Sequence, residues 1–229
     1  ISSIVPIDTE EAIVSVIGLE KFEQENVFVF TATRDGQIKR SQLADYAVSR
    51  YSKPIKTMNL KGDDVMIMAE LVTPDQELLL TTNTSYSIRF AMEELPVTGV
   101  KTAGVKGIQL KDGEYLAAAN VLKPGAEQDI VIVTQRGAVK RMNVSEIELG
   151  NRAKRGVVTL KELKANPHRV FAIVVVKVSD TIVLETEKGV QEEIKIVNLS
   201  RADRYSNGSL RVDTVGDGAL VRVAVLKQQ

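Results

Sequence analysis

The sequence repeats itself with a period of about fifty residues, and this repeat restricts the fold more than any single motif does. Each copy has a short run of β-branched and apolar residues, a polar turn and a second short run, which together predict a β-hairpin. The hairpins span residues 27–40, 77–90, 130–141 and 181–193. Gly36, Gly137 and Gly189 supply the positive φ that such turns need, whereas Tyr86 at that place in the second copy predicts a different turn.

A second apolar run follows each hairpin at a constant distance. These runs lie at residues 65–72, 115–122, 170–176 and 220–226, and Ile13–Leu19 is a similar run ahead of the first hairpin. Weaker strand signals stand just upstream, near Leu60, Leu110, Leu160 and Leu210 or Val212. Two residues past each turn position stand Ile38, Ile88, Val139 and Gln191, which are 50, 51 and 52 residues apart. This phase predicts a repeated unit of roughly four short strands.

The apolar runs are continuous blocks, which is typical of strands covered on both faces. Four-stranded units with a ~40–50-residue period predict an all-β, propeller-like array, whereas the alternative, a generic β-sandwich, predicts no regular period. We expect one domain over residues 1–229, with repeats at 26–75, 76–127, 128–178 and 179–229 and a partial first unit at 1–25. About four and a half visible copies predict five to six blades.

Composition excludes several classes of site. The chain has no cysteine, which excludes disulfides, zinc–thiolate sites and thiol nucleophiles. Its one histidine, His168, stands in an Asn-Pro-His-Arg turn, and no cluster of His, Asp and Glu has the spacing of metal ligands. The longest apolar run, 170–176, is far short of the ~20 residues that span a bilayer, and no export signal is visible. We therefore expect a cytoplasmic protein with no membrane partner, metal or catalytic residue.

The repeat also arranges the charges. Thirty basic and thirty acidic residues give a net charge of zero, which as an average argues against a nucleic-acid partner. Basic residues nevertheless recur at two phases, on the second hairpin strand and in the loop before each Leu60-type strand. They are Lys39, Arg40, Arg50, Lys53, Lys56, Arg89, Lys101, Lys106, Lys140, Arg141, Arg152, Lys154, Arg155, Arg201 and Arg204. Because equivalent positions of an array lie on one rim, we expect a positive belt that binds DNA.

Such a belt would contact phosphates, so binding to double-stranded DNA should be sequence-independent and weaken as salt rises. A duplex that follows a curved basic surface must bend, so its binding depends on how easily the DNA deforms as well as on the phosphate contacts. The fourth copy has Glu192 and Glu193 in place of the basic pair, and the belt is predicted to weaken there. Reversal of four charges is expected to weaken DNA binding without unfolding the domain; these are Lys140, Arg141, Lys154 and Arg155.

The repeat resembles that of the C-terminal domain of bacterial type IIA topoisomerase A subunits. The resemblance rests on Thr134-x-x-Gly137-x-Val139-Lys140-Arg141, on the loop that ends in Lys154-Arg155-Gly156 and on the strand that runs to Leu160. Copies near Thr33 and Asn83 fit the same template, so it covers nearly the whole chain. Gyrase A subunits carry a Gln-Arg-Arg-Gly-Gly-Lys-Gly box that this sequence lacks, which makes it more similar to the topoisomerase IV branch.

The resemblance implies a β-pinwheel, a propeller-like disc whose blades exchange strands, and the missing box implies an open or broken disc. It implies an outer rim that binds and bends DNA for the strand-passage core of an isomerase, in decatenation and supercoil relaxation. The domain itself would not be an enzyme, because the catalytic tyrosine, ATP and Mg²⁺ belong to other parts. The implied partners are double-stranded DNA, the N-terminal catalytic core that belongs to the same polypeptide and, through this core, the ATPase subunit. The implied location is a bacterial cytoplasm, at the nucleoid.

Two alternatives stay open. One is a gyrase A wrapping domain without a recognisable box. The other is a protein-binding β-propeller scaffold, which should display aromatic or apolar hot spots on one face. Aromatic residues make up only 4% of the chain, which favours DNA. Binding to duplex DNA at low salt separates the scaffold from both DNA-binding functions.

Overall fold

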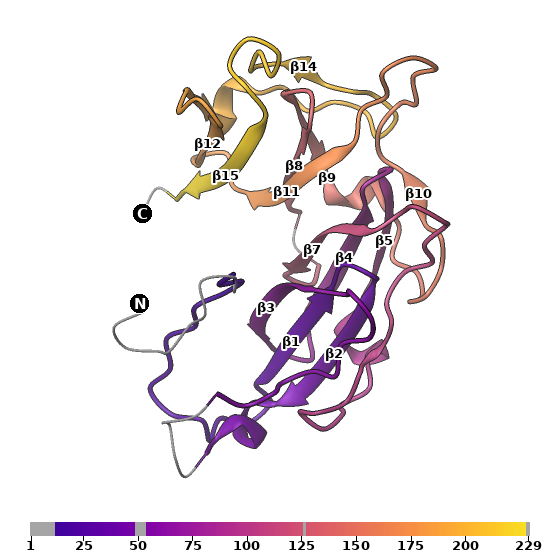
Figure 1. Ribbon diagram of the computed structural model, residues 1–229, viewed down its shortest axis with the longest axis vertical. Helices are drawn as coiled ribbons and strands as arrows, with labels where there is room; N and C mark the ends of the chain where they lie inside the picture. Colours follow the sequence, from indigo (N-terminus) through magenta and orange to yellow (C-terminus); the bar gives the residue numbers. More distant parts are fainter. Residues whose placement is uncertain (1–11, 49–53, 126, 228–229) are drawn as a thin grey trace.

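The computed structural model describes residues 12–48, 54–125 and 127–227. These residues form four small antiparallel sheets that follow one another in an arc, from indigo to yellow in Figure 1. We call each sheet a blade and number the blades in chain order. The propeller-like, all-β architecture is confirmed. The described residues hold four blades, so the prediction of five to six is wrong for them.

Each blade is built on a hairpin whose strands lie where the repeat predicted. β1 (Phe28–Thr33) pairs with β2 (Gln37–Gln42), β4 (Glu77–Thr82) with β5 (Tyr86–Ala91), β8 (Asp129–Thr134) with β9 (Ala138–Asn143), and β12 (Thr181–Thr186) with β13 (Gln191–Lys195). A short 3-10 helix follows each second strand: η1 (Leu43–Tyr46), η2 (Met92–Glu94), η3 (Val144–Glu146) and η4 (Ile196–Asn198).

The second hairpin has the same turn as the others, contrary to the sequence prediction. Ser85, with a φ of 70°, takes the place of Gly36, Gly137 and Gly189, and its N–H donates to Thr82 as theirs donate to the matching threonines. The register also shows that Ser87, and not Ile88, is the equivalent of Ile38. The sequence prediction, which places Tyr86 at the turn position of the second repeat, is therefore displaced by one residue, because Ser85 occupies that position.

A third strand completes the inner side of each blade. These strands are β3 (Met66–Val72), β7 (Leu116–Leu122), β11 (Val170–Val176) and β15 (Leu220–Leu226), and each pairs with the first strand of its hairpin. Residues of all four line a central cavity of about 810 Å³. The second apolar runs are thus confirmed as strands. The prediction for Ile13–Leu19 is wrong, since these mostly exposed residues form no strand and no described hairpin precedes them to pair with.

The outer edge of a blade is supplied by the following repeat. The two-residue strands β6 (Val105–Lys106), β10 (Val157–Val158) and β14 (Ser209–Leu210) cross back to pair with β2, β5 and β9. They are shorter and begin earlier than the signals near Leu110 and Leu160, and no strand forms at Leu60. In the described ranges β13 has no such partner, so blade 4 has three strands and the array stays open between β3 and β15 (Figure 1).

The core lies between the blades. One face of each hairpin packs against the opposite face of the next, so Phe30 meets Leu80, Leu79 meets Ile132, and Val131 meets Leu184 in three separate clusters. Strands covered in this way on both sides explain the continuous apolar blocks of the sequence. No helix in the described part of the chain has the length and apolar character needed to cross a membrane.

Candidate nucleic-acid interface

Three segments of equal length connect the hairpins of blades 2, 3 and 4 to the outer edge of the blade that precedes each of them. We call residues 97–106, 149–158 and 201–210 the exchange loops. Each begins at a parallel bridge to an arginine of the preceding blade, which joins Arg40 to Val97, Arg89 to Leu149 and Arg141 to Arg201. Each ends in an exchanged strand. The loops therefore form the perimeter of the arc.

A glycine at positive φ allows each exchange loop to enter the sheet. Gly104, Gly156 and Gly208 have φ values of 84°, 82° and 70°. A Cβ atom at Gly156 would lie 2.2 Å from the carbonyl oxygen of Ser87, and one at Gly208 would lie 2.2 Å from that of Val139. No side chain fits such an approach, so this glycine, repeated every 52 residues, marks strand exchange in the sequence.

Successive exchange loops contact one another, so the perimeter is continuous. The Ala153 N–H donates to the carbonyl of Gly107 at 2.7 Å, and the Gln109 N–H donates to that of Lys154 at 2.9 Å. Farther along, the Arg204 guanidinium donates to the carbonyl of Val158 at 2.6 Å. These bonds join neighbouring loops edge to edge.

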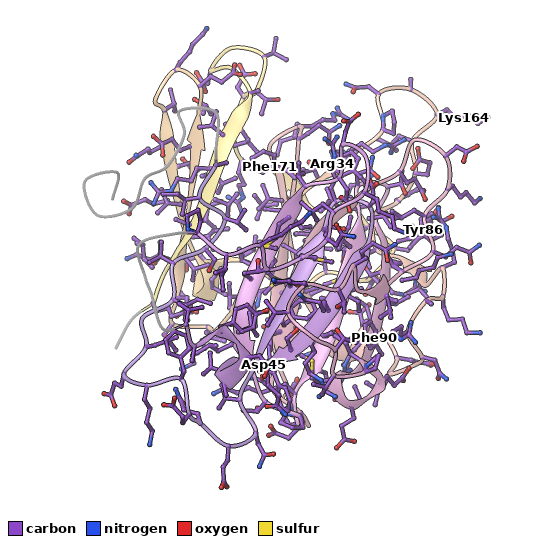
Figure 2. All side chains as sticks on the ribbon, turned by 60° about the horizontal axis from the view of Figure 1, so that its bottom comes forward. Arg34, Asp45, Tyr86, Phe90, Lys164 and Phe171 are labelled. Carbon is purple, nitrogen blue, oxygen red and sulfur yellow. The ribbon has the colours of Figure 1, made fainter. Side chains whose placement is uncertain are left out.

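The perimeter is locally basic although the chain is neutral. Residues 96–111 contain three lysines and no carboxylate, and residues 149–161 contain four basic residues and no carboxylate. Lys56, Lys101, Lys106 and Lys154 are exposed, and Arg152 and Arg204 are half-exposed. Figure 2 shows side chains that project outward on the side of the molecule where Tyr86 lies. Some carboxylates contact this perimeter, since Glu94 accepts from the Arg152 N–H and Glu146 accepts from the Arg204 N–H. The more distant carboxylates have little effect, because the potential acts over ~8–10 Å in salt.

Two predicted belt residues are buried instead. Lys39 and Lys140 are each 1% exposed, and both ammonium groups donate to backbone carbonyls. Burial lowers the pKa of both lysines to about 8. They lie on the second hairpin strand, whose alternation places one face under the next repeat, so they are not part of an exposed rim. The expectation that Lys140 tolerates charge reversal without unfolding is therefore not supported by its environment.

The arginines of the second strand also lie at the junctions between blades. Arg141 is 8% exposed and bonds Asp129, with Nε to Oδ2 at 2.7 Å, while Nη1 donates to the carbonyls of Ile196 and Leu199. Arg89 pairs with Glu77 at 2.6 Å in the same way. Arg40 has no such acid, because Phe28 stands there and its ring lies 4.9 Å from the guanidinium. These side chains join blades and are poorly placed to meet a ligand.

Two further predicted residues are neutralised by carboxylates. Arg155 forms a bidentate pair with Glu114, whose Oε1 lies 2.5 Å from Nη2, and its guanidinium lies 3.6 Å from the centre of the Tyr86 ring. Hydrogen bonding from Arg155 lowers the pKa of Glu114 to about 2. Arg201 is exposed but pairs with Glu127 and Asp129. Both contribute less free positive charge than their positions predicted.

Comparison with known proteins agrees with this architecture. A family model described as "DNA gyrase C-terminal domain, beta-propeller" matches residues 28–69, 76–123 and 128–177. The chain belongs to this family. Two curated relatives are the A subunits of DNA topoisomerase 4 from Bacillus subtilis (strain 168), 39% identical over 97% of this chain, and from Staphylococcus epidermidis (strain ATCC 12228 / FDA PCI 1200), 36% identical over 93%. The chain spans 27% and 26% of the length of these relatives.

Two solved structures have a similar fold. The crystal structure of the C-terminal domain of DNA topoisomerase IV matches with a TM-score of 0.94 and 42% identity, over 99% of this chain and 69% of that chain. The structure of the DNA gyrase A C-terminal domain matches with a TM-score of 0.83 and 20% identity, over 99% and 74%, which shows the fold alone. The chain is thus similar to topoisomerase IV domains over nearly its whole length.

The basic perimeter includes residues that the sequence reasoning missed. Lys111, Lys161 and Arg211 are exposed and follow the three exchange loops, and the exposed Lys61 stands 50 residues before Lys111. Their regular spacing was the available signal. Arg50 and Lys53 lie outside the described residues. Within the described ranges, no three His, Cys, Asp or Glu residues gather in a group able to hold a metal ion.

Proposed function

We propose that the domain binds duplex DNA along the exchange loops and bends it. The observation that carries this proposal is the continuous perimeter in which exposed lysines recur in two successive exchange loops, 97–106 and 149–158, that contain no carboxylate. Lysine ammonium groups of this kind bind phosphates as point charges, so affinity should not depend on base sequence. A duplex that follows Lys101, Lys106 and Lys154 in turn must follow the curvature of the arc.

The finer role is also a proposal, because the chain covers only about a quarter of the curated relatives. We infer that the domain presents bent duplex to the strand-passage core of a topoisomerase IV A subunit, for decatenation and supercoil relaxation. We also propose that the chain is part of an ATP-dependent isomerase whose catalytic tyrosine lies in another part of the protein. So do a bacterial cytoplasmic location and an indirect partnership with the ATPase subunit.

The test compares two triple variants with the same change of charge. In the first, Lys101, Lys106 and Lys154 are replaced by glutamine. In the control, Lys123, Lys177 and Lys227, which line the central cavity, are replaced by glutamine. Each lost phosphate contact lowers the slope of log affinity against log salt by ~0.9, so we expect the perimeter variant to lose about two to three units of slope and the control almost none.

Three outcomes contradict the proposal in different ways. Equal losses in both variants would show that only net charge matters. A loss of slope confined to the cavity variant would show that DNA binds at the central cavity and not along the perimeter. No binding of the unchanged domain at low salt would favour the protein-binding scaffold. Circularisation of short duplexes then measures bending. If a topological assay shows that the duplex is wrapped with a fixed handedness, this result would favour gyrase-like wrapping over the gentler bend proposed.

A further inference from the structure

Lys39 and Lys140 are buried at the junctions between blades, where an ammonium group is costly unless it is hydrogen-bonded. Each is 1% exposed, and they rank among the largest fully buried side chains of the domain. Neither forms an ion pair with a described carboxylate. Both must therefore be satisfied by other acceptors.

The acceptors are carbonyl groups of two successive loops. Lys140 Nζ donates to the Thr159 carbonyl at 2.5 Å and, in the next exchange loop, to those of Arg204 at 2.6 Å, Ser206 at 3.0 Å and Asp203 at 3.1 Å. Lys39 Nζ donates in the same pattern to the carbonyls of Thr57 and Val100. Since the exchange loops have equal length, Val100 and Arg204 are equivalent positions.

The middle junction shows what the lysine replaces. There the equivalent residue is Ile88, which has no donor. The exchange loop instead closes directly on the preceding loop, because the Ala153 N–H, at a residue with a φ of 62°, donates to the carbonyl of Gly107. Gly107 is the equivalent of Thr57 and Thr159, since each directly precedes a buried apolar residue, which is Ile108, Met58 or Leu160. The exchange loops 97–106 and 201–210 lack this backbone bond, and each is held by a buried lysine ammonium group. The exchange loop 149–158 has the backbone bond and no buried lysine.

The held carbonyls stand next to the residues that project from the perimeter. Val100 precedes the exposed Lys101, and Arg204, itself half-exposed, precedes Tyr205, which is 55% exposed. We propose that Lys39 and Lys140 are positioning residues of the DNA interface, which fix the exchange loops through their carbonyls and so orient Lys101 and Arg204 without touching DNA. The effect on DNA binding rests on the proposed function, whereas the holding of the exchange loops by the two lysines does not.

The experiment is a double-mutant cycle on the whole domain. The single variants are Lys140→Met and Arg204→Ala, and the salt dependence of duplex binding is measured for each and for the double variant. If Lys140 acts by positioning Arg204, all three lose the same ~0.9 of slope, because one phosphate contact is lost in each. Lys140→Met combined with Lys101→Ala, at the other junction, should instead lose about twice that.

Two results would overturn the proposal. A double variant that loses about 1.8 of slope would mean that Lys140 contacts phosphate on its own. An unchanged affinity and slope for Lys140→Met would mean that the lysine only stabilises the fold. If Lys140→Met does not fold, the same cycle with Lys39→Met and Lys101→Ala tests the junction at which the ammonium holds fewer carbonyls.

Hydrogen exchange separates this proposal from the proposed function. Amides of residues 201–208 should exchange faster in Lys140→Met, while those of 149–156 keep their protection. Ile88→Met is the matched control, since it changes the equivalent side chain at the junction without a lysine and should release no loop. Unchanged exchange at 201–208 refutes the holding role even if the domain does not bind DNA, whereas faster exchange without any DNA binding refutes only the proposed function.

Discussion

β9 and β13 occupy the same place in successive blades, but they carry opposite charges. Lys140 and Arg141 of β9 stand opposite Ile132 and Val131, and Glu192 and Glu193 of β13 stand opposite the equivalent Leu184 and Val183. The edge of β9 receives β14, whereas the edge of β13 receives no strand in the described ranges. The two hairpins have five cross-strand pairs each and the same turn, with Gly137 and Gly189 at positive φ.

The difference shows what holds one repeat to the next. Both cations of β9 donate to carbonyls of the following repeat, and carboxylates at these positions would face the same carbonyls with no proton to donate. Glu185 adds a charge to the face of blade 4 where the other blades have Ala32, Thr81 and Val133. The capacity to hold a neighbour thus lies in a few side chains and not in the hairpin itself.

Charge reversal gives the largest expected contrast. Lys140→Glu with Arg141→Glu leaves Asp129 buried beside like charge, and breaking a buried pair in this way costs ~3–5 kcal/mol. The matched reversal, Glu192→Lys with Glu193→Arg, changes an open edge and should alter the free energy of unfolding by less than ~0.5 kcal/mol. Thermal and urea unfolding measure both. Equal destabilisation of the two variants would contradict the comparison.

Glycine substitution should separate the same two regions by a smaller amount. Gly208→Ala forces a Cβ to within 2.2 Å of the Val139 carbonyl at the exchanged strand, and we expect a loss of roughly 2–3 kcal/mol. Gly189→Ala in the β12–β13 turn has nothing within 4 Å of the added atom, so only the left-handed backbone is strained, at ~1 kcal/mol. Urea unfolding compares them, and a larger loss at Gly189 would contradict the assignment of the close approach.

Acid should weaken the middle junction, where the carboxylate helps to hold the exchange loop. The pKa of Glu114 is about 2 in the folded domain and ~4.3 in an unfolded chain. A lowered folded pKa means that the stabilisation is complete above pH ~4.3 and is lost as the pH falls toward 2. The difference in melting temperature between the unchanged domain and Glu114→Gln should therefore shrink from pH 6 to pH 3. A constant difference would exclude the ion pair with Arg155 as its source.

Neutralising the acids of β13 should have the smallest effect. Glu192→Gln with Glu193→Gln removes like-charge repulsion near the end of the perimeter, and we expect duplex affinity to rise less than ~threefold at low salt. The slope against salt should not change, because no phosphate contact is created. Fluorescence anisotropy with a labelled duplex is sensitive enough. A tenfold gain would show that DNA runs over blade 4 and that the carboxylates exclude it.

The sequence was sufficient for the hairpins and inner strands because their period and apolar blocks are local features. It was insufficient for Lys39 and Lys140, since the position of a lysine on a strand does not show whether another repeat will cover it. The same limit applies to Arg155, whose acid partner Glu114 lies 41 residues away. Exchange itself had a local signal in Gly104, Gly156 and Gly208, but its meaning depends on carbonyls of a different blade.

Strand exchange makes the repeat and the blade different units, and this affects how such a protein can change in length. Duplication of any fifty-residue segment supplies one new acceptor edge together with one new donor loop, so no internal edge is left unfilled. Deletion of a whole repeat is equally conservative, whereas loss of half a repeat exposes a backbone edge that invites aggregation. The number of blades, and with it the length of the perimeter, can therefore evolve in whole steps while only the last edge needs residues of its own.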